Sequence, residues 1–253
     1  MKIVVSPAKK IIPENNSFGM KTTRSLLHKE TKKILEVTKS MSKGELKKLM
    51  NISDPLAKLN YERYQNFDPS PSANKEVQAV FTFKGDTYVG LDVGNFSKQD
   101  IAFAQEHLRI LSGLYGVLRP LDGIQPYRLE MGTKIEVNGK SNLYEFWSNS
   151  VTGILKEDLA GDTQTLLNLA SEEYFKVIDK KQIKSTVITP VFKSFKNGKL
   201  KTIGILSKRA RGMMANFIIK NRIQDLQKIK EFSNDGYSFD KSLSTEKDLI
   251  FVK

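Results

Sequence analysis

The spacing of apolar residues changes along the chain between the period of a strand and that of a helix. Short apolar runs predict strands at residues 1–7, 109–112, 165–170, 237–239 and 249–252. Helical spacing predicts helices at residues 22–41, 100–108 and 142–159, the last with Trp147 facing inward. Strand–helix alternation with late hairpins favours an α+β (mixed α/β) fold, a single domain in which helices surround one twisted mixed sheet.

Two short helices are predicted between residues 42 and 66. Ser42-Lys-Gly-Glu45 fits a capping box for a helix Glu45–Met50, and Asp54-Pro55 fits an N-cap followed by proline, opening a helix through Tyr64. This unit has the form of a helix–hairpin–helix, whose turn presents backbone amides to a nucleic-acid phosphate. The usual glycine-rich turn is missing, so an ordinary helical hairpin packed through its leucines is the alternative.

A β-hairpin is predicted late in the chain. The segments 185–196 and 199–208 are rich in β-formers and flank Asn197-Gly198, the dipeptide typical of a two-residue type I′ turn. That turn would place Lys196 opposite Lys199. Because Pro190 lacks a backbone donor, we expect its strand to be an edge strand or to carry a bulge.

Three cations follow this hairpin. A helix is predicted at Met213–Arg222, so Lys208, Arg209 and Arg211 would lie at or just before its N-terminus. Cations are unfavourable there unless an anion binds, because the helix dipole already attracts negative charge. The pattern indicates a phosphate or carboxylate site, and the alternative is that these side chains extend into water.

Composition excludes several classes of protein. The chain has 253 residues, no cysteine and two histidines, which excludes disulfides, thiolate catalysis and a multi-histidine metal site. No apolar run approaches the roughly 20 residues that cross a bilayer. With no repeat and no linker beyond a loop at Asn66–Asn74, we expect one cytoplasmic domain over residues 1–253, with a helical insertion at about 42–66, no metal and no cofactor.

The net charge of +13 is concentrated in one part of the chain. Residues 176–230 contain 15 Lys and Arg but only two acids, and the remainder of the chain is neutral. Such a stretch steers anionic partners toward one surface, although lysines scattered over a solvated face would give the same composition.

Two loops carry further candidate chemistry. Gly113–Pro120 contains two glycines, a proline and Arg119, which is typical of a shaped loop at a strand end. In the segment 126–132, Arg128 and Glu130 would lie on the same side of an extended chain and could form an ion pair.

Six sequence blocks resemble the YaaA peroxide-stress protein family. They are Ser6–Lys9, Phe83–Asp86, Leu111–Pro120, Gln125–Gly132, Asn168–Phe175 and Lys208–Gly212, in that order. Lys10 departs from the family pattern, which has threonine after Ser-Pro-Ala-Lys.

The resemblance implies a cytosolic protein that limits damage by hydrogen peroxide, is associated with lowering free intracellular iron, and binds DNA independently of sequence, as duplex or bubble. DNA would lie in a basic cleft and on the helix–hairpin–helix-like turn. The cleft candidates are Lys9, Lys84, Arg119, Arg128, Lys208, Arg209 and Arg211. The turn candidates are Asn51, Ile52, Ser53, Asp54 and Pro55.

Two other functions share the same charge pattern. An enzyme acting on a nucleotide, nucleobase or other small phosphorylated anion would use Glu130, Glu172 or Tyr127 as catalytic groups, with no reaction class implied. An RNA-binding protein would stack bases on exposed aromatics such as Phe192 or Tyr127. The sequence predicts neither the oligomeric state nor the preferred nucleic acid.

Overall fold

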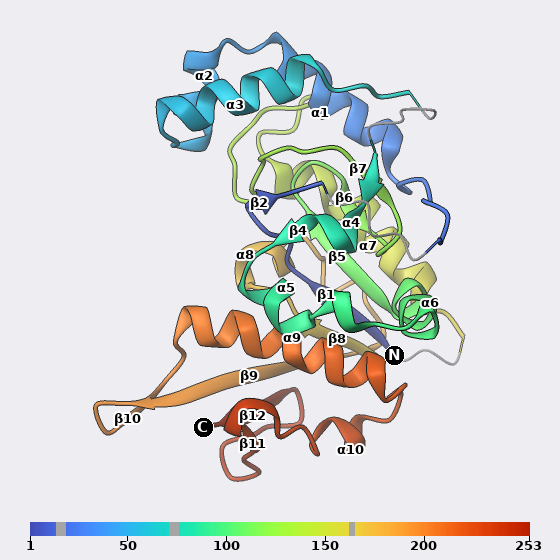
Figure 1. Cartoon of the computed structure of the whole chain (residues 1–253), viewed down its shortest axis with the longest axis vertical. Helices are drawn as coiled ribbons and strands as arrows, with labels where there is room; N and C mark the ends of the chain where they lie inside the picture. Colours follow the sequence, from blue (N-terminus) through green and yellow to red (C-terminus); the bar gives the residue numbers. More distant parts are fainter. Residues whose placement is uncertain (14–18, 71–75, 162–164) are drawn as a thin grey trace.

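A mostly parallel sheet forms the centre of the molecule, as the mixed pattern predicts (Figure 1). The computed structural model describes residues 1–13, 19–70, 76–161 and 165–253. Across the sheet, the parallel strands are β12 (Asp248–Val252), β9 (Thr186–Lys196), β8 (Thr165–Leu169), β1 (Lys2–Val5) and β5 (Leu108–Ser112). The antiparallel strands β11 (Ser238–Phe239) and β6 (Gly116–Leu118) close its two edges. The predicted α+β single-domain fold with a mixed sheet is therefore confirmed.

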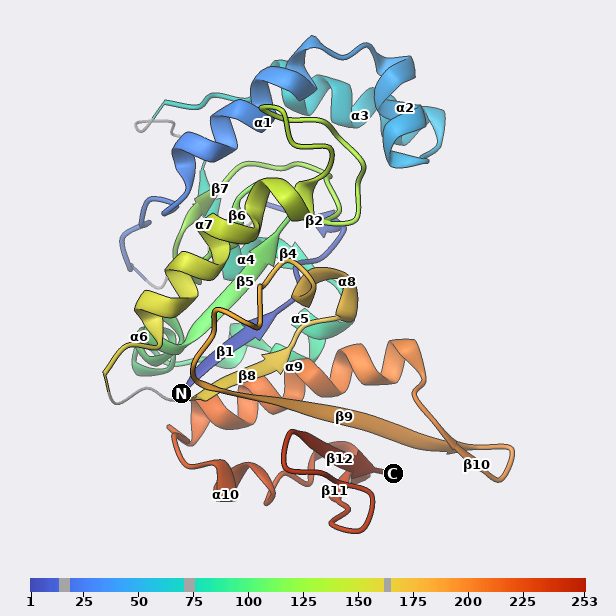
Figure 2. The ribbon, with the colours of Figure 1, turned by 180° about the vertical axis from the view of Figure 1, so that it is seen from behind.

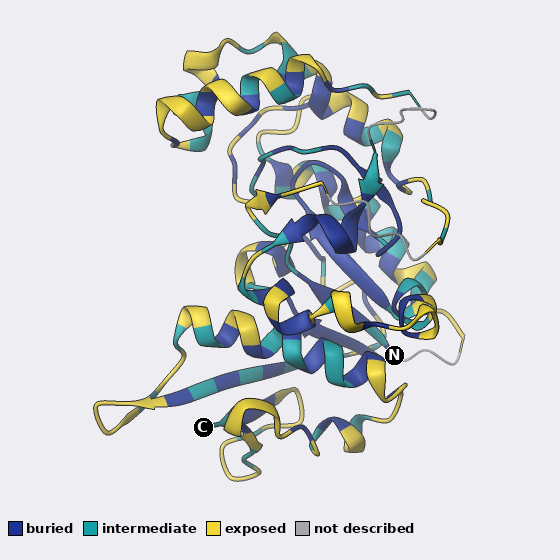
Figure 3. Ribbon diagram, in the orientation of Figure 1, coloured by how far each residue is buried: buried dark blue, intermediate teal, exposed yellow. Residues whose placement is uncertain are grey.

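Helices cover both faces of this sheet. The long helix α9 (Gly204–Lys220) crosses one face beside α5 (Asp86–Leu91), and Figure 2 shows α7 (Leu143–Asp158) on the opposite face. Trp147 of α7 is fully buried, as predicted, and its indole nitrogen donates to the carbonyl of Gly113 over 2.9 Å. Helix α6 (Lys98–His107) leads directly into β5. The buried residues form one continuous core (Figure 3).

Shorter elements connect this frame. They are β2 (Lys10–Ile11), β3 (Val77–Gln78), α4 (Ala79–Thr82), β4 (Phe83–Lys84), η1 (Val93–Asn95), β7 (Gly123–Ile124), α8 (Glu172–Phe175), α10 (Leu226–Ile229) and η2 (Asn234–Gly236). Strand β2 pairs with β4, and β3 pairs with β7, each antiparallel. Residues 71–75 of the expected loop Asn66–Asn74 lie outside the described residues.

The predicted helical hairpin projects from the sheet (Figure 1). It consists of α2 (Lys43–Met50) and α3 (Asp54–Gln65), and the capping box of Ser42 and Glu45 is present. The N-cap of α3 is Ser53, not Asp54 as predicted, because the helix starts one residue earlier and takes Asp54 into its first turn. Asp54 instead binds Lys47 Nζ at 2.7 Å.

Helix α1 (His28–Ser40) begins later than the predicted Thr22. The preceding residues are held as extended chain: the amide of Thr23 donates to the carbonyl of Leu121, and the amide of Gly123 donates to that of Thr23. Backbone pairing with β7 thus replaces the first predicted helical turns.

The late hairpin forms with the predicted turn. Asn197 and Gly198 both have positive φ, and Lys196 pairs with Lys199. The prediction of an edge strand was wrong, because β9 lies between β8 and β12. Pro190 is tolerated because β8 pairs with β9 only as far as Ile188, so beyond that point no donor is needed on the β8 side.

The second strand of the hairpin is shorter than predicted. β10 spans Lys199–Lys201, and α9 starts at Gly204, so Lys208, Arg209 and Arg211 lie within the helix and not at its N-terminus. The N-terminal anion site predicted for these three residues is therefore wrong, because the helix pattern extends nine residues further back than Met213.

Two glycines set the crossing of α5 and α9. A Cβ atom at Gly212 would lie 1.8 Å from the carbonyl oxygen of Thr87, and one at Gly90 would lie 2.1 Å from that of Arg209. Only glycine lets the two backbones approach so closely. This contact fixes which residues of α9 face the carboxyl ends of the strands.

Within the described part of the chain, none of the helices is both long and apolar enough to cross a bilayer. The same residues contain no cluster of three or more His, Asp or Glu side chains that could bind a metal ion.

Candidate nucleic-acid interface

The candidate site begins where β1 and β8 end. Ser6 follows β1, and Ser171 follows β8, so both lie at the edge where open parallel sheets bind ligands. The amide of Ser171 donates to Ser6 Oγ over 2.9 Å, and that hydroxyl donates to Ser171 Oγ over 3.2 Å. The hydroxyl of Tyr88 donates to the carbonyl of Ser6, which ties α5 to the same point.

These serines lie in a cavity of about 470 Å³, which we call the strand-end cavity. It is lined by Ser6–Lys10, Lys84–Tyr88, Ser171–Tyr174, Lys208 and Arg211. Four of the predicted cleft cations therefore line one cavity, although they come from three distant parts of the sequence. Glu172, one of the catalytic candidates, lines it as well.

Of the two α9 cations that line this cavity, Arg211 is the more buried. Its side chain is half-buried, while Lys208 is exposed. Burial lowers the pKa of the Arg211 guanidinium from its ordinary value, and no described residue forms an ion pair or hydrogen bond with it. A partly desolvated guanidinium without an acceptor is poised to bind an anion.

Next to this cavity, Glu130 bridges two of the candidate cations. Its carboxylate binds Lys9 Nζ at 2.9 Å and Arg128 Nη2 at 3.2 Å. The predicted Arg128–Glu130 ion pair is thus confirmed, with Lys9 as a third member. The Nε atom of Arg128 is buried and has no hydrogen-bond partner. Glu130 holds the two cations side by side and leaves a net positive charge.

A second cavity, of about 370 Å³, separates this ion cluster from the helical hairpin. It is lined by Leu49, Met50, Asn51, Arg128, Glu130, Gly132, Thr133 and Glu173. The hydroxyl of Tyr64 on α3 donates to the carbonyl of Arg128 over 2.7 Å. The hairpin is therefore anchored to the segment that carries the ion cluster.

The two cavities and the cluster are adjacent and share lining residues, and we call the surface that they make together the trough. A small cavity lined by Lys9, Arg128 and Glu130 lies between them, and Glu173 lines both of the larger cavities. The elements that carry these lining residues, α9, α8, β2 and the turn between α2 and α3, lie along the left side of the molecule in Figure 1.

Two cleft candidates lie elsewhere. Arg119 follows β6, whose Leu118 pairs with Ile110 of β5, so it lies two strands away from β1 and Ser6. Its Nη2 atom binds Asp122 Oδ1 at 2.9 Å and donates to the carbonyl of Arg24. Arg209 is exposed on α9 but does not line the trough.

The aromatic candidates are core residues. Tyr127 and Phe192 are 3% and 1% exposed, so neither can stack a base as the RNA-binding alternative requires. The Tyr127 hydroxyl lies 2.6 Å from Ser112 Oγ, and burial raises its pKa above the ordinary value. Among the described residues, Phe195 is an exposed aromatic, 65% accessible. Its position near a lysine-rich hairpin tip could have identified it from the sequence.

Sequence reasoning also missed residues of the trough. Asp86, Tyr88, Ser171 and Glu173 line it and were not among the candidates. Ser171 and Glu173 belong to the block Asn168–Phe175 directly after a predicted strand, and that position was the available signal.

The concentrated charge of residues 176–230 is dispersed in three dimensions. Arg222 and Lys220 bind Asp100 at 2.6 and 3.6 Å on the far part of α9, and Lys196 and Lys199 lie on the β-hairpin. From this stretch, Lys208 and Arg211 reach the strand-end cavity.

Comparison with known proteins gives one consistent result. Residues 1–243 match the family model described as peroxide stress protein YaaA. UPF0246 proteins of Legionella pneumophila (strain Lens), Saccharophagus degradans and Clostridium beijerinckii are 48%, 44% and 44% identical. Each alignment covers all of this chain and 98–99% of the relative.

Proposed function

Because this chain belongs to the YaaA family of peroxide stress proteins, we propose that it protects against hydrogen peroxide by binding DNA in the trough. The DNA contacts would be made to phosphates, and duplex and bubble DNA of any sequence would bind. The family match supports the role in peroxide stress. DNA binding is what the family resemblance leads us to expect, and the positive charge of the trough supports it. We place this action in the cytoplasm.

One observation carries the proposal: cations from separate parts of the sequence line a single trough. Lys9, Lys84, Lys208 and Arg211 surround the strand-end cavity, and Arg128 lines the next one. Contacts from lysine and arginine to phosphates position a nucleic acid and carry no information about base sequence. Arg211 and Arg128 supply guanidinium groups that lack a full set of acceptors.

The helical hairpin would extend this surface. Its turn, Asn51–Ser53, is followed by Pro55 in the first turn of α3. The amides of Asn51 and Ile52 already bind carbonyls of α2. Among the described residues, the amides of Ser53, Asp54 and Leu56 have no such acceptor, so these are the groups that we assign to a phosphate. Lys47 offsets the charge of Asp54 at this end of the helix.

Binding through phosphates makes a quantitative prediction about salt. If the trough neutralises three to five phosphates, log K should fall with log[salt] with a slope of about −3 to −4.5. The measurement is fluorescence anisotropy of labelled duplex and bubble DNA between about 50 and 200 mM salt, a range over which phosphate contacts change the affinity strongly. Affinity that is absent, or unchanged across this range, would contradict the proposal.

The strand-end cavity also supports a second function, an enzyme acting on a nucleotide or other phosphorylated substrate. The supporting observation is that two serine hydroxyls, Glu172 and Arg211 share a cavity of about 470 Å³ at the carboxyl ends of parallel strands. Backbone binding does not require that mixture of groups.

Glu130→Gln separates the two functions. Removing the carboxylate frees Lys9 and Arg128, so a DNA-binding role predicts equal or greater DNA affinity and retained survival of cells exposed to peroxide. If DNA affinity is retained but protection is lost, the enzymatic function is supported instead. Isosteric glutamine keeps the size of the side chain, and a melting curve verifies that the variant folds.

The family resemblance also leads us to propose an association with limiting free intracellular iron. The test is the chelatable iron of cells that lack the protein or carry the Glu130→Gln variant, measured after peroxide exposure. Equal iron in deletion and parent cells would contradict this part of the proposal.

A further inference from the structure

Another large cavity lies apart from the trough, between the start of α1 and β7. Its volume is about 480 Å³, within the range of sites for small molecules. It is lined by Thr22–Ser25, His28, Thr31, Lys32, Leu35, Phe67, Pro69, Ser70, Glu76, Tyr115 and Gly123. None of these residues lines either of the two larger cavities of the trough. We call it the α1 pocket.

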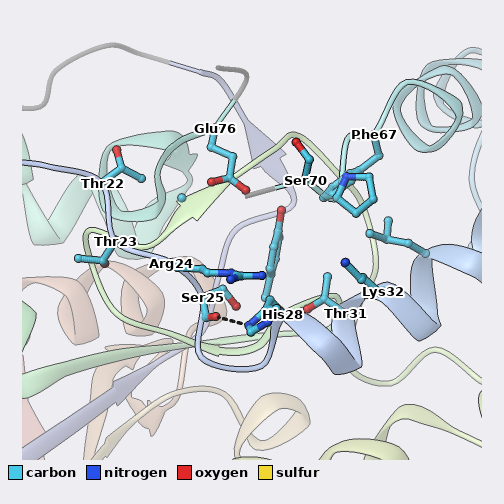
Figure 4. A pocket seen from close by; sticks show the side chains of 14 residues that line it. Thr22, Thr23, Arg24, Ser25, His28, Thr31, Lys32, Phe67, Ser70 and Glu76 are labelled. Carbon is cyan, nitrogen blue, oxygen red and sulfur yellow. Dashed lines mark hydrogen bonds between the residues drawn. The ribbon is translucent and has the colours of Figure 1, made fainter. Parts of the chain in front are cut away.

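Groups of opposite charge converge in this pocket. Figure 4 shows the carboxylate of Glu76 entering from one side, and the side chains of Arg24, Lys32 and His28 reaching the same space from other sides. Among the described residues, the side chains of Arg24, Lys32 and Glu76 form no hydrogen bond or ion pair. They are therefore available to a ligand.

A buried hydroxyl gives an independent sign of a ligand. Ser25 is 6% exposed and lines the pocket, and its Oγ atom has no hydrogen-bond partner. Buried polar atoms without a partner are rare, since burial removes the hydrogen bonds that water would provide. This hydroxyl therefore lies unsatisfied in the wall of the pocket.

The carboxylate of Glu76 packs against β7. A Cβ atom at Gly123 would lie 2.5 Å from Glu76 Oε2, so the carboxylate rests against the backbone of β7. Burial is the largest influence on this group and raises the pKa of Glu76 to about 7, against the attraction of Arg24. The largely buried rings of Phe67 and Tyr115, with centroids 6.4 Å apart, give the pocket an apolar wall.

These groups specify a ligand with three parts. An anionic group suits Arg24, Lys32 and His28, and a planar apolar part suits the aromatic wall. Glu76 has two acceptor oxygens, which match a pair of neighbouring N–H donors. Guanine presents such a pair on its base-pairing edge, and a 5′-phosphate supplies the anion.

We propose that the α1 pocket binds a purine nucleoside monophosphate of the guanine type. Glu76 accepts from the base, and Arg24 and Lys32 hold the phosphate. This site is separate from the trough, so its occupation does not depend on whether the trough binds DNA.

Isothermal titration calorimetry with the full chain tests the proposal. GMP should bind at least ten times more tightly than guanosine or ribose 5-phosphate, and more tightly than AMP, whose base offers one amino group beside an acceptor. Glu76→Gln and Arg24→Ala should each weaken GMP at least tenfold. Lys29→Ala, which removes an exposed cation of α1 outside the pocket, should leave the affinity unchanged.

Three results would overturn it: GMP bound no more tightly than inorganic phosphate, equal affinity for GMP and AMP, or unchanged GMP affinity in Glu76→Gln. Melting curves of the variants show whether they are folded. DNA affinity, measured on the same samples, should be the same in Glu76→Gln as in the parent, so failure of this site and failure of the trough are distinguished.

Discussion

Asp100 shows how single ionisable residues contribute to the stability of this molecule. Burial opposes its ionisation, but hydrogen bonds from Ser97 and the pairing with Arg222 lower the pKa of Asp100 to about 2. Its ordinary value in an unfolded chain is about 4. The group therefore stabilises the fold above about pH 4, and this contribution is lost as the pH falls toward 2.

Asp100→Asn should consequently lower the free energy of unfolding by about 2 kcal/mol at pH 7. Denaturant unfolding of parent and variant at several pH values measures this difference, which should shrink as the pH approaches 2. A difference that is constant with pH would show that the charge of Asp100 is not its cause.

Glu76 should have the opposite pH dependence. Its pKa of about 7 lies above the ordinary value, so the folded protein loses stability as the pH rises from about 4.5 through 7. Arg24, His28 and Lys32 face it across the α1 pocket, and Asp68 and Asp122 act on it through space. Glu76→Gln should therefore melt a few degrees higher than the parent at pH 8, with no gain at pH 4. A gain at pH 4 equal to that at pH 8 would contradict this assignment.

At the scale of elements, the crossing of α5 and α9 is the contact that positions Lys208 and Arg211. Gly212→Ala would place a methyl group 1.8 Å from the carbonyl of Thr87, so the helices must separate. We expect a loss of about 3 kcal/mol or more in unfolding free energy, together with weaker DNA binding.

Gly153→Ala is the matched control for this substitution. Gly153 lies inside α7 with open space around it, so alanine should stabilise the protein by about 0.5 to 1 kcal/mol through helix propensity. Thermal unfolding of both variants measures the contrast. Equal effects would show that the close approach of α5 and α9 does not limit stability.

Elements with strong local signals could be predicted from the sequence. The capping box at Ser42, the Asn197-Gly198 turn and the inward Trp147 depend on neighbouring residues, and all three are present. The starts of α1 and α9 could not be predicted, because they are set elsewhere. Pairing of Thr23 with Leu121 and Gly123 keeps the residues before α1 extended. Helix α9 continues through Gly212, where the missing Cβ lets it pack against α5.

The same difference between local signals and contacts of distant residues decides which parts of the candidate site could be predicted. Arg128 and Glu130 are two residues apart, so their ion pair followed from local geometry. That Lys9 joins them, and that Arg119 lies two strands away from Ser6 and outside the trough, depends on strand order and direction. Periodicity carries no information about either, so the trough became defined only with the sheet topology.

At the scale of the whole molecule, we expect the position of the charges to matter more for DNA binding than the net charge. Outside the trough, cations such as Arg222 and Lys220 are bound to Asp100 and hold α9 against α6. If DNA responded only to the total of +13, any three exposed cations would matter equally. If the trough binds DNA, its own cations must dominate.

A charge-matched comparison tests this claim most directly. One variant replaces Lys9, Lys208 and Arg211 with alanine; the other replaces Lys181, Lys228 and Lys241, which are exposed and lie outside the trough. Duplex DNA affinity is measured against salt for both. We predict that the trough variant loses affinity for all sequences alike and that its salt slope falls by about 2 to 3, while the control stays close to the parent. Equal losses in the two variants would contradict the account.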